Sequence, residues 1–269
     1  MKIAALQMVS GTDVAANVRA AGLALAEAAE AGAELALLPE YFCLLGRSET
    51  DKLALAETPG HGPLQDFLAT QAQRLGLWIA GGTIPLATAD AGKVLNSTLV
   101  FNPQGQAVAR YDKIHLFRYS GERESHDETR TIAAGTESTA FELPSRDGHR
   151  WRIGLSICYD LRFPELYRRL RSDLLLVPSA FTHTTGQAHW EVLLRARAIE
   201  NLAFVAAAAQ GGVHDNGRRT WGHSMLIDPW GQVLAQRAEG AGVVLADLAA
   251  ADLGRRRQQL PALDHRVLP

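Results

Sequence analysis

The sequence predicts a single α/β domain in which buried strands alternate with covering helices. Short apolar runs of strand length recur along the 269-residue chain, and longer helix-like segments separate them. Apolar residues make up 47% of the chain and charged residues only 21%, so it can bury a substantial core. No low-complexity linker or short-period repeat divides the sequence. One domain spanning residues 1–269 is therefore the expected organisation.

The first half of the chain opens with the order strand, helix, strand. An Asp before a long Ala- and Leu-rich segment is a typical helix start, and a Gly after such a segment ends it. A turn containing Pro and Gly between two strand-like runs is typical of a hairpin, so the sheet should be mixed. The predicted elements are a strand at 2–8, a helix from Asp13 to near Gly32, a strand at 34–38, a helix at 61–75, a strand at 77–81, and a hairpin of residues 94–101 and 106–111 around the turn at 102–105.

The second half repeats the alternation after a polar stretch, residues 118–135, which is expected to be a loop. Strands again lead into helices, and a second hairpin closes the pattern. The predicted elements are strands at 139–143 and 150–157, a helix at 160–170, a strand at 173–177, a helix at 187–201, a strand at 203–209, and a hairpin of residues 222–228 and 233–235.

Composition excludes several classes of partner. Twenty-seven basic residues against 29 acidic ones give a formal charge of -2, and no Lys/Arg block is present that would bind nucleic acid or an anionic membrane. The N-terminus lacks the apolar core of a signal peptide, and no uncharged stretch reaches membrane-spanning length. A soluble cytoplasmic protein with a small-molecule partner is expected. Cys43 and Cys158 should then be free thiols.

Three reactive side chains are each predicted to follow the end of a strand. Glu40, Lys113 and Cys158 occupy such positions, where α/β sheets leave room for a ligand. A thiol at a strand-to-helix turn should be exposed, and the helix dipole there favours the thiolate. Glu40 could accept its proton, while Lys113 and the backbone N–H of Tyr159 could stabilise an oxyanion. The pattern favours nucleophilic catalysis by Cys158.

Each of these residues also has a simpler interpretation. A Cys after an apolar strand is more often inert packing than a nucleophile, and a Glu or Lys at a strand end is usually a solvated charge. The histidines are not separated along the sequence by the intervals typical of metal ligands, so no metal site is predicted. This holds for His183, His189, His214 and His223.

Longer stretches of sequence carry a family resemblance. Three segments resemble the signatures of the nitrilase, or carbon-nitrogen hydrolase, superfamily, and further matches to its Nit branch follow in order along nearly the whole chain. The three segments are Leu38-Pro39-Glu40, the stretch from Tyr111 to Phe117, and the stretch from Ile157 to Glu165. The further matches are residues 178–181, 188–191, 195–201 and 222–225.

The resemblance implies a four-layer αββα sandwich, with two mixed sheets face to face and helices outside. It also implies a catalytic triad of Glu40, Lys113 and Cys158 that needs neither a metal nor an organic cofactor. Members of the family usually dimerise through the helical layer. The helix at 187–201, the helix after Cys158 and the C-terminal segment 260–269 are therefore candidate homodimer contacts, although their apolar faces could equally be core.

Further site residues follow from the resemblance. The family's second glutamate best matches Glu128, although ordinary solvation would explain Glu122, Glu124 and Glu128 alike. Arg162 resembles the carboxylate-binding arginine of the branch, and Thr185 is a second expected contact. An ion pair of Arg162 with Glu165 or Asp160 is the competing interpretation.

The implied reaction is hydrolysis of a small carboxylate-bearing amide through a Cys158 thioester, with release of ammonia. The loop at 206–212 and the adjoining His214 resemble those of the deaminated-glutathione amidases of the branch more than those of the ω-amidases, which implies deaminated glutathione as the substrate. An ω-amidase acting on α-ketoglutaramate, a nitrilase or N-carbamoyl hydrolase with the same triad, and a catalytically silent scaffold subunit remain alternatives.

Overall fold

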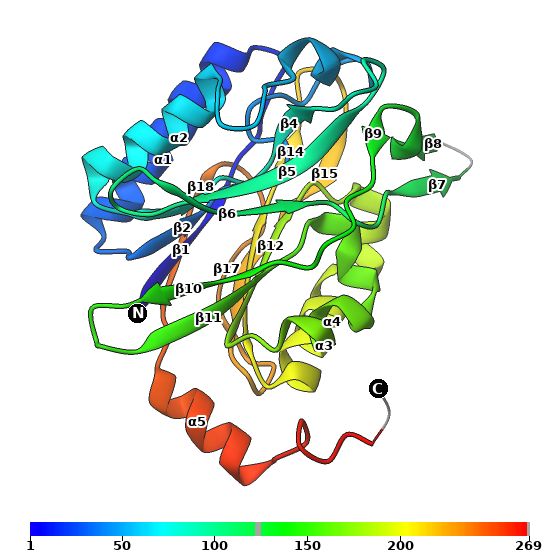
Figure 1. Cartoon of the computed structure of the whole chain (residues 1–269). Helices are drawn as coiled ribbons and strands as arrows, with labels where there is room; N and C mark the ends of the chain where they lie inside the picture. Colours follow the sequence, from blue (N-terminus) through cyan, green and yellow to red (C-terminus); the bar gives the residue numbers. More distant parts are fainter. Residues whose placement is uncertain (122–124, 268–269) are drawn as a thin grey trace.

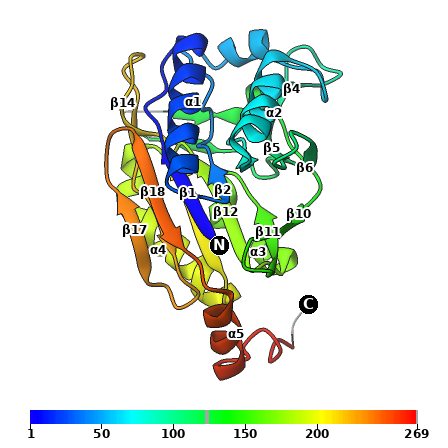
Figure 2. The ribbon, with the colours of Figure 1, turned by 90° about the vertical axis from the view of Figure 1, so that its left-hand side faces the viewer.

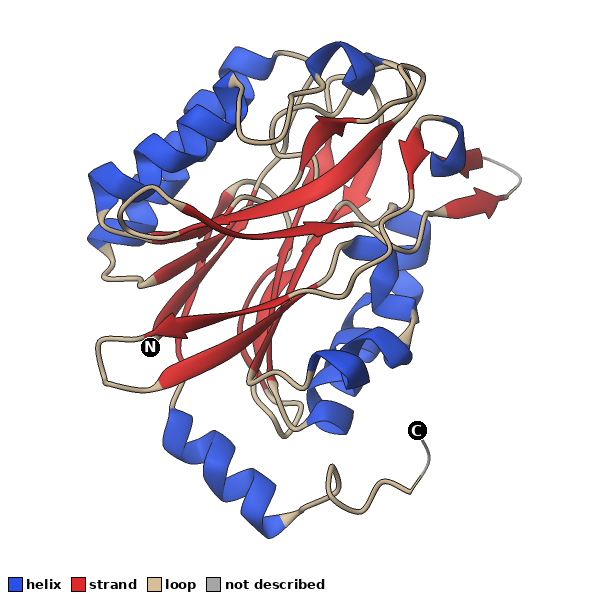
Figure 3. Ribbon diagram, viewed as in Figure 1, coloured by secondary structure: helices blue, strands red, loops and turns tan. Residues whose placement is uncertain are grey.

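Two β-sheets pack face to face and helices cover their outer faces (Figure 1). The computed structural model describes residues 1–121 and 125–267. Colouring by secondary structure separates the two outer layers of helix from the two inner layers of strand (Figure 3). The predicted αββα sandwich with two mixed sheets is confirmed.

The first sheet has eight strands. Its centre is parallel, because β1 pairs with β2 and β2 with β3 in parallel. On either side of this centre, β18 pairs antiparallel with β1 and β5 pairs antiparallel with β3, while the short strand β9 pairs parallel with β5. Figure 2 shows β18, β1 and β2 side by side. The strands in spatial order are β18 (Gly242–Asp247), β1 (Lys2–Gln7), β2 (Leu35–Leu37), β3 (Trp78–Ala80), β5 (Val94–Phe101) and β4 (Ile84–Ala87), with β6 (Ala107–Asp112) and β9 (Ile132–Ala133) also paired to β5.

The second sheet has six strands and the same plan, a parallel centre with antiparallel edges. Two short hairpins lie outside both sheets. The six strands in order are β10 (Ala140–Pro144), β11 (Arg150–Leu155), β12 (Leu174–Ser179), β13 (Phe204–Ala209), β16 (Ser224–Ile227) and β17 (Val233–Arg237). The hairpins are β7 (Arg118–Ser120) with β8 (Ser125–Asp127), and β14 (Gly211–Val213) with β15 (Arg219–Trp221).

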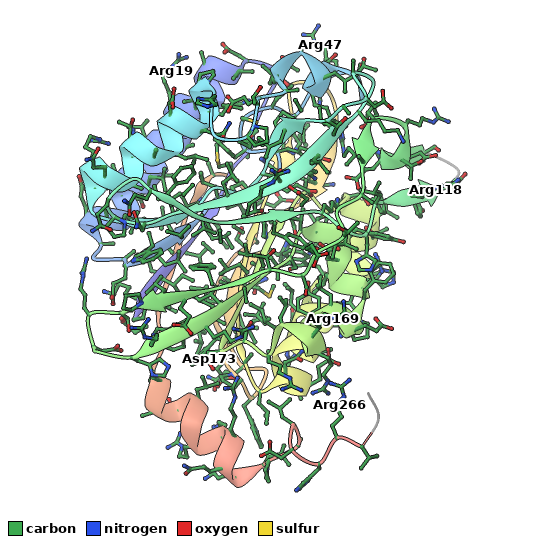
Figure 4. The ribbon with its side chains drawn as sticks, in the orientation of Figure 1. Arg19, Arg47, Arg118, Arg169, Asp173 and Arg266 are labelled. Carbon is green, nitrogen blue, oxygen red and sulfur yellow. The ribbon has the colours of Figure 1, made fainter. Side chains whose placement is uncertain are left out.

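Helices α1 (Val14–Glu30) and α2 (Pro63–Leu75) cover the first sheet, and α3 (Pro164–Leu170) and α4 (His183–Asn201) cover the second (Figure 1). The Asp13 carboxylate caps α1 by accepting the N–H of Ala16, as its position predicts. Charged side chains such as Arg19 and Arg169 project from these layers (Figure 4). The remaining helical elements are α5 (Ala250–Gln259) and the short 3₁₀ turns η1 (Asp51–Leu55), η2 (Glu128–Arg130) and η3 (Cys158–Arg162).

Successive side chains of β1 point to opposite faces of the sheet, so this strand packs against two layers. Ile3 and Ala5 face the layer between the sheets, where they join residues of the second sheet such as Trp151. Ala4 and Leu6 face α1 and α2 instead. Both faces of this strand are therefore buried, as its unbroken apolar sequence requires.

Several predicted boundaries are wrong. The stretch at 118–135 is not one loop, because it contains β7, β8, η2 and β9. The helix predicted at 160–170 is divided at Phe163, since Pro164 begins a new helix and disfavours helical backbone at the residue before it. The helix predicted at 187–201 begins four residues earlier, at His183, where the Thr182 hydroxyl provides the N-cap.

Among the described residues, no helix is both long and apolar enough to cross a membrane.

Candidate active site

Four predicted site residues meet in one cleft. Glu40 lies after β2, Lys113 directly after β6, Cys158 in the turn after β11, and Glu128 at the start of η2. All four line one open cleft. The loops beyond the strand ends therefore gather these side chains, as the α/β pattern predicts.

The Lys113 ammonium sits between two carboxylates. Its Nζ lies 2.9 Å from Oε1 of Glu40 and 2.9 Å from Oε1 of Glu128. The Lys113 and Glu40 side chains are each only 1% exposed, so solvent screens this pair very little. Glu128 is buried beside the lysine, and the simple interpretation of a solvated loop carboxylate is wrong for it. Glu122 and Glu124, which shared that interpretation, lie outside the described residues.

Both carboxylates are held by further donors. Oε2 of Glu40 accepts the N–H of Ala180 at 2.9 Å, and its Oε1 accepts from the Asn96 side chain at 2.9 Å. Oε1 of Glu128 accepts the Tyr41 hydroxyl at 2.9 Å. Its Oε2 accepts the N–H of Phe117 at 2.7 Å. These bonds fix the two carboxylates, so Lys113 is positioned from two sides.

Asn96, Tyr41 and Ala180 are site residues that the sequence analysis missed. The sequence offers one signal for Asn96, since a polar amide in a buried strand such as β5 needs a hydrogen-bond partner. Ala180 contributes only its backbone N–H, which no side-chain pattern reveals. Burial, together with the charges of Glu128 and Glu40, raises the pKa of Tyr41, so its hydroxyl keeps the proton that it donates.

Cys158 opens the turn η3 in a strained conformation. Its φ of 49° is in the left-handed region that residues with a side chain rarely adopt. Its thiol is buried, at 7% exposure for the residue, so the expectation of an exposed thiol is wrong. Loops from several strands close over it, including the one that carries Ala180.

The buried Asp160 carboxylate holds this turn in place. Its Oδ2 accepts the N–H of Ile157 at 2.8 Å and the hydroxyl of Tyr111 at 2.7 Å. Its Oδ1 accepts the N–H of His115 at 3.1 Å. Tyr111 and His115 flank Lys113 in the chain, so Asp160 ties the lysine segment to the cysteine turn.

Electrostatics at the thiol contradict the thiolate expected from a helix dipole. Burial raises the pKa of Cys158 well above its ordinary value, and Glu40 adds to the rise. Lys113 and the Ala180 N–H lower this pKa without reversing the change. Burial alone would lower the pKa of Lys113, but Glu128 and Glu40 outweigh it and hold this pKa well above its ordinary value. The site therefore combines a protonated thiol with a charged lysine.

A smaller cavity adjoins the cleft and shares Cys158 with it. Arg162 and Thr185 both line this cavity, as does Tyr159. The Arg162 guanidinium lies 5.7 Å from the ring centre of Tyr159 and 5.6 Å from that of Phe181. The Thr185 hydroxyl lies 3.0 Å from that of Thr182.

The competing interpretation of Arg162 as one half of an ion pair is wrong for this structure. Within the described part of the chain, Arg162 pairs with neither Asp160 nor Glu165. Its two terminal nitrogens instead lie 3.3 Å from Nδ1 of His189. Asp160 is fully buried and occupied by the donors described above. The guanidinium is therefore available to an acidic group in the small cavity.

A buried thiol beside a fixed carboxylate and a fixed ammonium is suited to covalent acyl transfer. Tyr159, second residue of η3, carries an N–H without an intrahelical acceptor, which adds a donor beside the thiol. Across residues 1–121 and 125–267, no group of three or more His, Cys, Asp or Glu side chains is placed to hold a metal ion.

Comparisons with known proteins agree with this chemistry. Residues 2–258 match the family described as "Carbon-nitrogen hydrolase". A deaminated glutathione amidase from Synechocystis sp. is 44% identical over 98% of this chain and 97% of its own length. The NitFhit protein of C. elegans superposes with a TM-score of 0.88 at 36% identity, covering 99% of this chain and 65% of that longer one. A mutant amidase from Nesterenkonia sp. superposes at 0.78 with 27% identity, over 97% and 95% of the two chains. It carries the acetamide moiety of fluoroacetamide on its active-site cysteine.

Proposed function

This chain belongs to the carbon-nitrogen hydrolase family, and from that premise we propose that it hydrolyses deaminated glutathione with Cys158 as the nucleophile. The observation that carries the proposal is the Lys113 ammonium, held 2.9 Å from both Glu40 and Glu128 in the cleft that contains the thiol. In this scheme Glu40 is the proton carrier, Lys113 the fixed cation and Glu128 the group that positions Lys113.

The first half of the reaction forms a thioester. Glu40 takes the proton of the Cys158 thiol as Sγ attacks the amide carbon, because a thiol with a raised pKa needs a base at the moment of attack. Lys113 and the N–H of Tyr159 stabilise the oxyanion that develops. The C–N bond then breaks, and Glu40 delivers the proton to the departing nitrogen.

The second half hydrolyses the thioester. Glu40 removes a proton from water, the resulting hydroxide adds to the thioester carbon, and the proton returns to Sγ as the C–S bond breaks. The sum is amide plus water to acid plus amine. The expected release of ammonia holds for a primary amide such as α-ketoglutaramate. Deaminated glutathione joins its keto-acid part to cysteinylglycine, so this dipeptide is the amine that leaves.

The small cavity supports a keto-acid substrate. Arg162 presents a planar fork of donors suited to a carboxylate, and Thr185 adds a hydroxyl on the same wall. Phe117 and Phe181 supply apolar surface for the carbon chain between the carboxylate and the scissile bond. We assign Arg162 and Thr185 to the acyl part of the substrate.

The test compares four substrates with wild type and Cys158→Ala. Products from deaminated glutathione are 2-oxoglutarate and cysteinylglycine, and ammonia is measured from α-ketoglutaramate, a simple nitrile and an N-carbamoyl amino acid. We expect hydrolysis of deaminated glutathione and its loss in the variant. Faster turnover of α-ketoglutaramate would favour an ω-amidase. Turnover of the nitrile or carbamoyl compound alone would reject the keto-acid proposal, and turnover of none would favour a silent scaffold subunit.

Two features of organisation belong to the same proposal. Homodimerisation through α4 is supported by Val192 and Ile199, whose exposed fractions are 69% and 48% on the outer layer. Trp190 and Leu194 of the same helix are fully buried and so belong to the core. A cytoplasmic location is supported by two cysteines that are both free thiols. Sedimentation velocity tests the dimer, since Val192→Glu should shift it toward monomer.

A further inference from the structure

Two hollows meet at Cys158, and only the larger one is lined by Glu40. Glu40 has to protonate the departing nitrogen, and Glu40 lines the larger cleft but not the smaller cavity. The acyl part then occupies the cavity with Arg162, and the leaving amine points into the cleft. The cleft is the larger of the two hollows and is open to solvent, so the leaving amine can extend outward from it.

Most charged side chains on the cleft wall are already paired. Lys113 binds Glu40 and Glu128, and Lys52 donates to Glu49 at 2.7 Å. Asp127 accepts the N–H and hydroxyl of Thr129 and lies near two arginines outside the cleft wall. Among the described residues of the cleft wall, few charged side chains therefore remain available to bind a ligand.

Arg218 is different. Its guanidinium lines the cleft, yet it makes no hydrogen bond or ion pair of its own within the part of the chain that the structure describes. It lies near enough to Glu49 to lower the pKa of that carboxyl, but Lys52 is the larger electrostatic influence there and holds the Glu49 oxygen directly. A half-buried guanidinium without a protein partner keeps its planar fork of donors available to an anion in the cleft.

The chain around Arg218 is fixed. It precedes β15 in the β14–β15 hairpin, and its N–H donates to the side chain of Asn216 at 2.9 Å. The amide of Asn216 in turn donates to the carbonyls of Leu45 and Gly46, at 2.9 and 2.7 Å, on the neighbouring segment of the cleft. The hairpin is thereby attached to that segment, so Arg218 is held at the cleft before any ligand arrives.

We infer that Arg218 binds a carboxylate on the leaving-amine side of the substrate, and so selects amides whose departing amine ends in a free acid. The inference rests on the proposed function, because it assumes a peptide-like leaving group. It makes Arg218 the counterpart of Arg162, with one arginine for each end of a substrate that is acidic at both ends. Its role is specificity, because the proposed bond-making and proton-transfer steps are assigned to Cys158, Glu40 and Lys113.

The test is a pair of substrates that differ only at that carboxylate. One is α-ketoglutaryl-cysteinylglycine and the other is its C-terminal amide, and the quantity measured is the ratio of their kcat/KM values, acid over amide. We expect Arg218→Met to lower this ratio by about 10- to 100-fold, the range for a lost hydrogen bond to a charged group. Arg218→Lys should recover part of the ratio, because it restores the charge without the fork.

Arg219→Met is the matched control. Arg219 is the next residue in the hairpin, is exposed, and pairs at the surface with Glu239 at 3.0 Å. It should keep the wild-type ratio. The inference is overturned if Arg218→Met leaves the ratio within about twofold, or if Arg219→Met lowers it as much. If wild type hydrolyses neither peptide, the proposed substrate itself fails and the inference fails with it.

Discussion

At the scale of single residues, the site depends on how burial and charge oppose each other at Cys158. Burial and Glu40 raise the thiol pKa, whereas Lys113 lowers it. The resting thiol is therefore protonated and weakly reactive, and in the proposed scheme Glu40 removes its proton during the reaction. The rate at which the thiol is alkylated and the rate of amide hydrolysis should therefore change in opposite directions when Glu40 is substituted.

Glu40→Gln should abolish hydrolysis and yet make the thiol more acidic. The substitution removes the negative charge that raises the pKa of Cys158, so the thiolate fraction at pH 7 should rise. We expect turnover to fall by about 10²- to 10⁴-fold while alkylation of Cys158 by iodoacetamide becomes faster. The measurement is the alkylation rate across pH 7–9.5, with peptide mapping of the modified residue.

Cys43 is the internal control for that experiment. Burial raises the pKa of its thiol to about 12, so it should stay unmodified. Wild-type alkylation should increase with pH throughout the range, because the raised pKa of Cys158 keeps the thiol protonated until alkaline pH. Slower alkylation in Glu40→Gln would show that the carboxylate does not oppose ionisation.

Lys113→Met should destabilise the fold as well as the site. It leaves two carboxylates facing each other without their shared cation, in surroundings where the lysine was 1% exposed. Removing one partner of such a buried group costs about 3–5 kcal/mol of unfolding free energy. Urea unfolding measures it, and the double variant Lys113→Met, Glu128→Gln should recover part of the loss. A cost below about 1 kcal/mol would contradict this account of the ion-pair cluster.

At the scale of elements, the site residues lie just after the ends of strands, and the turn η3 fixes the backbone geometry of Cys158. The strained backbone of Cys158 persists because Asp160 accepts the N–H of Ile157 on one side and groups of the lysine segment on the other. Asp160 touches no reacting atom in this scheme and acts as a positioning residue.

Asp160→Asn should lower kcat more than it changes KM. The amide retains one acceptor oxygen, so some of the bonds to Ile157, Tyr111 and His115 are lost and the cysteine turn is less well held. We expect an unfolding cost of about 1–3 kcal/mol and a fall in kcat on deaminated glutathione with KM within about twofold. Asp252→Asn, on the surface of α5, is the control that should change neither. Equal changes in kcat and KM would argue against positioning.

Element boundaries also show what sequence could predict. Long periodic segments such as β5 and α1 were placed correctly, because several residues repeat one signal. Some strands of two to four residues were missed, because so few residues show little periodicity; examples are β4, β9 and β15. The equally short β2 and β3 were predicted, because each lies within a longer apolar run. The early start of α4 was missed because His, Thr and Gly in its first turn resemble loop sequence.

At the candidate site, too, sequence predicted what local patterns determine and missed what distant residues determine. The positions of Glu40, Lys113 and Cys158, the side chains we propose as catalytic, were predictable because each follows a strand expected from the sequence. The burial of Cys158 and the orientation of Arg162 were not, since both depend on residues distant in sequence. Ala180 closes over the thiol from the end of β12, and His189 meets Arg162 from α4. Sequence neighbours such as Glu165 suggested the wrong partner.

At the scale of the whole molecule, the site lies where loops from both sheets meet. Glu40 and Lys113 follow strands of the first sheet, and Cys158 follows a strand of the second. Gln210, at the end of β13, donates to the Glu40 carbonyl at 3.1 Å and to the Ser10 hydroxyl at 2.8 Å, joining the sheets beside the site. We propose that the sheets fold as one domain, because the apolar layer between them is shared.

Leu35→Ala tests that organisation. Leu35 is fully buried in the layer between the sheets, and its truncation should cost about 2–5 kcal/mol. One cooperative transition should remain, with far-UV circular dichroism and tryptophan fluorescence changing at the same urea concentration. Leu23→Ala, at a leucine 75% exposed on α1, should change stability little. Separate transitions for the two probes would indicate two independent units.

The covalent intermediate on Cys158 is the central claim, and intact-protein mass spectrometry after rapid acid quench tests it most directly. With deaminated glutathione, we predict an added α-ketoglutaryl group that maps to the peptide containing Cys158, is absent from Cys158→Ala, and never appears on Cys43. Full turnover without any such adduct, together with activity retained in Cys158→Ala, would contradict nucleophilic catalysis at this cysteine.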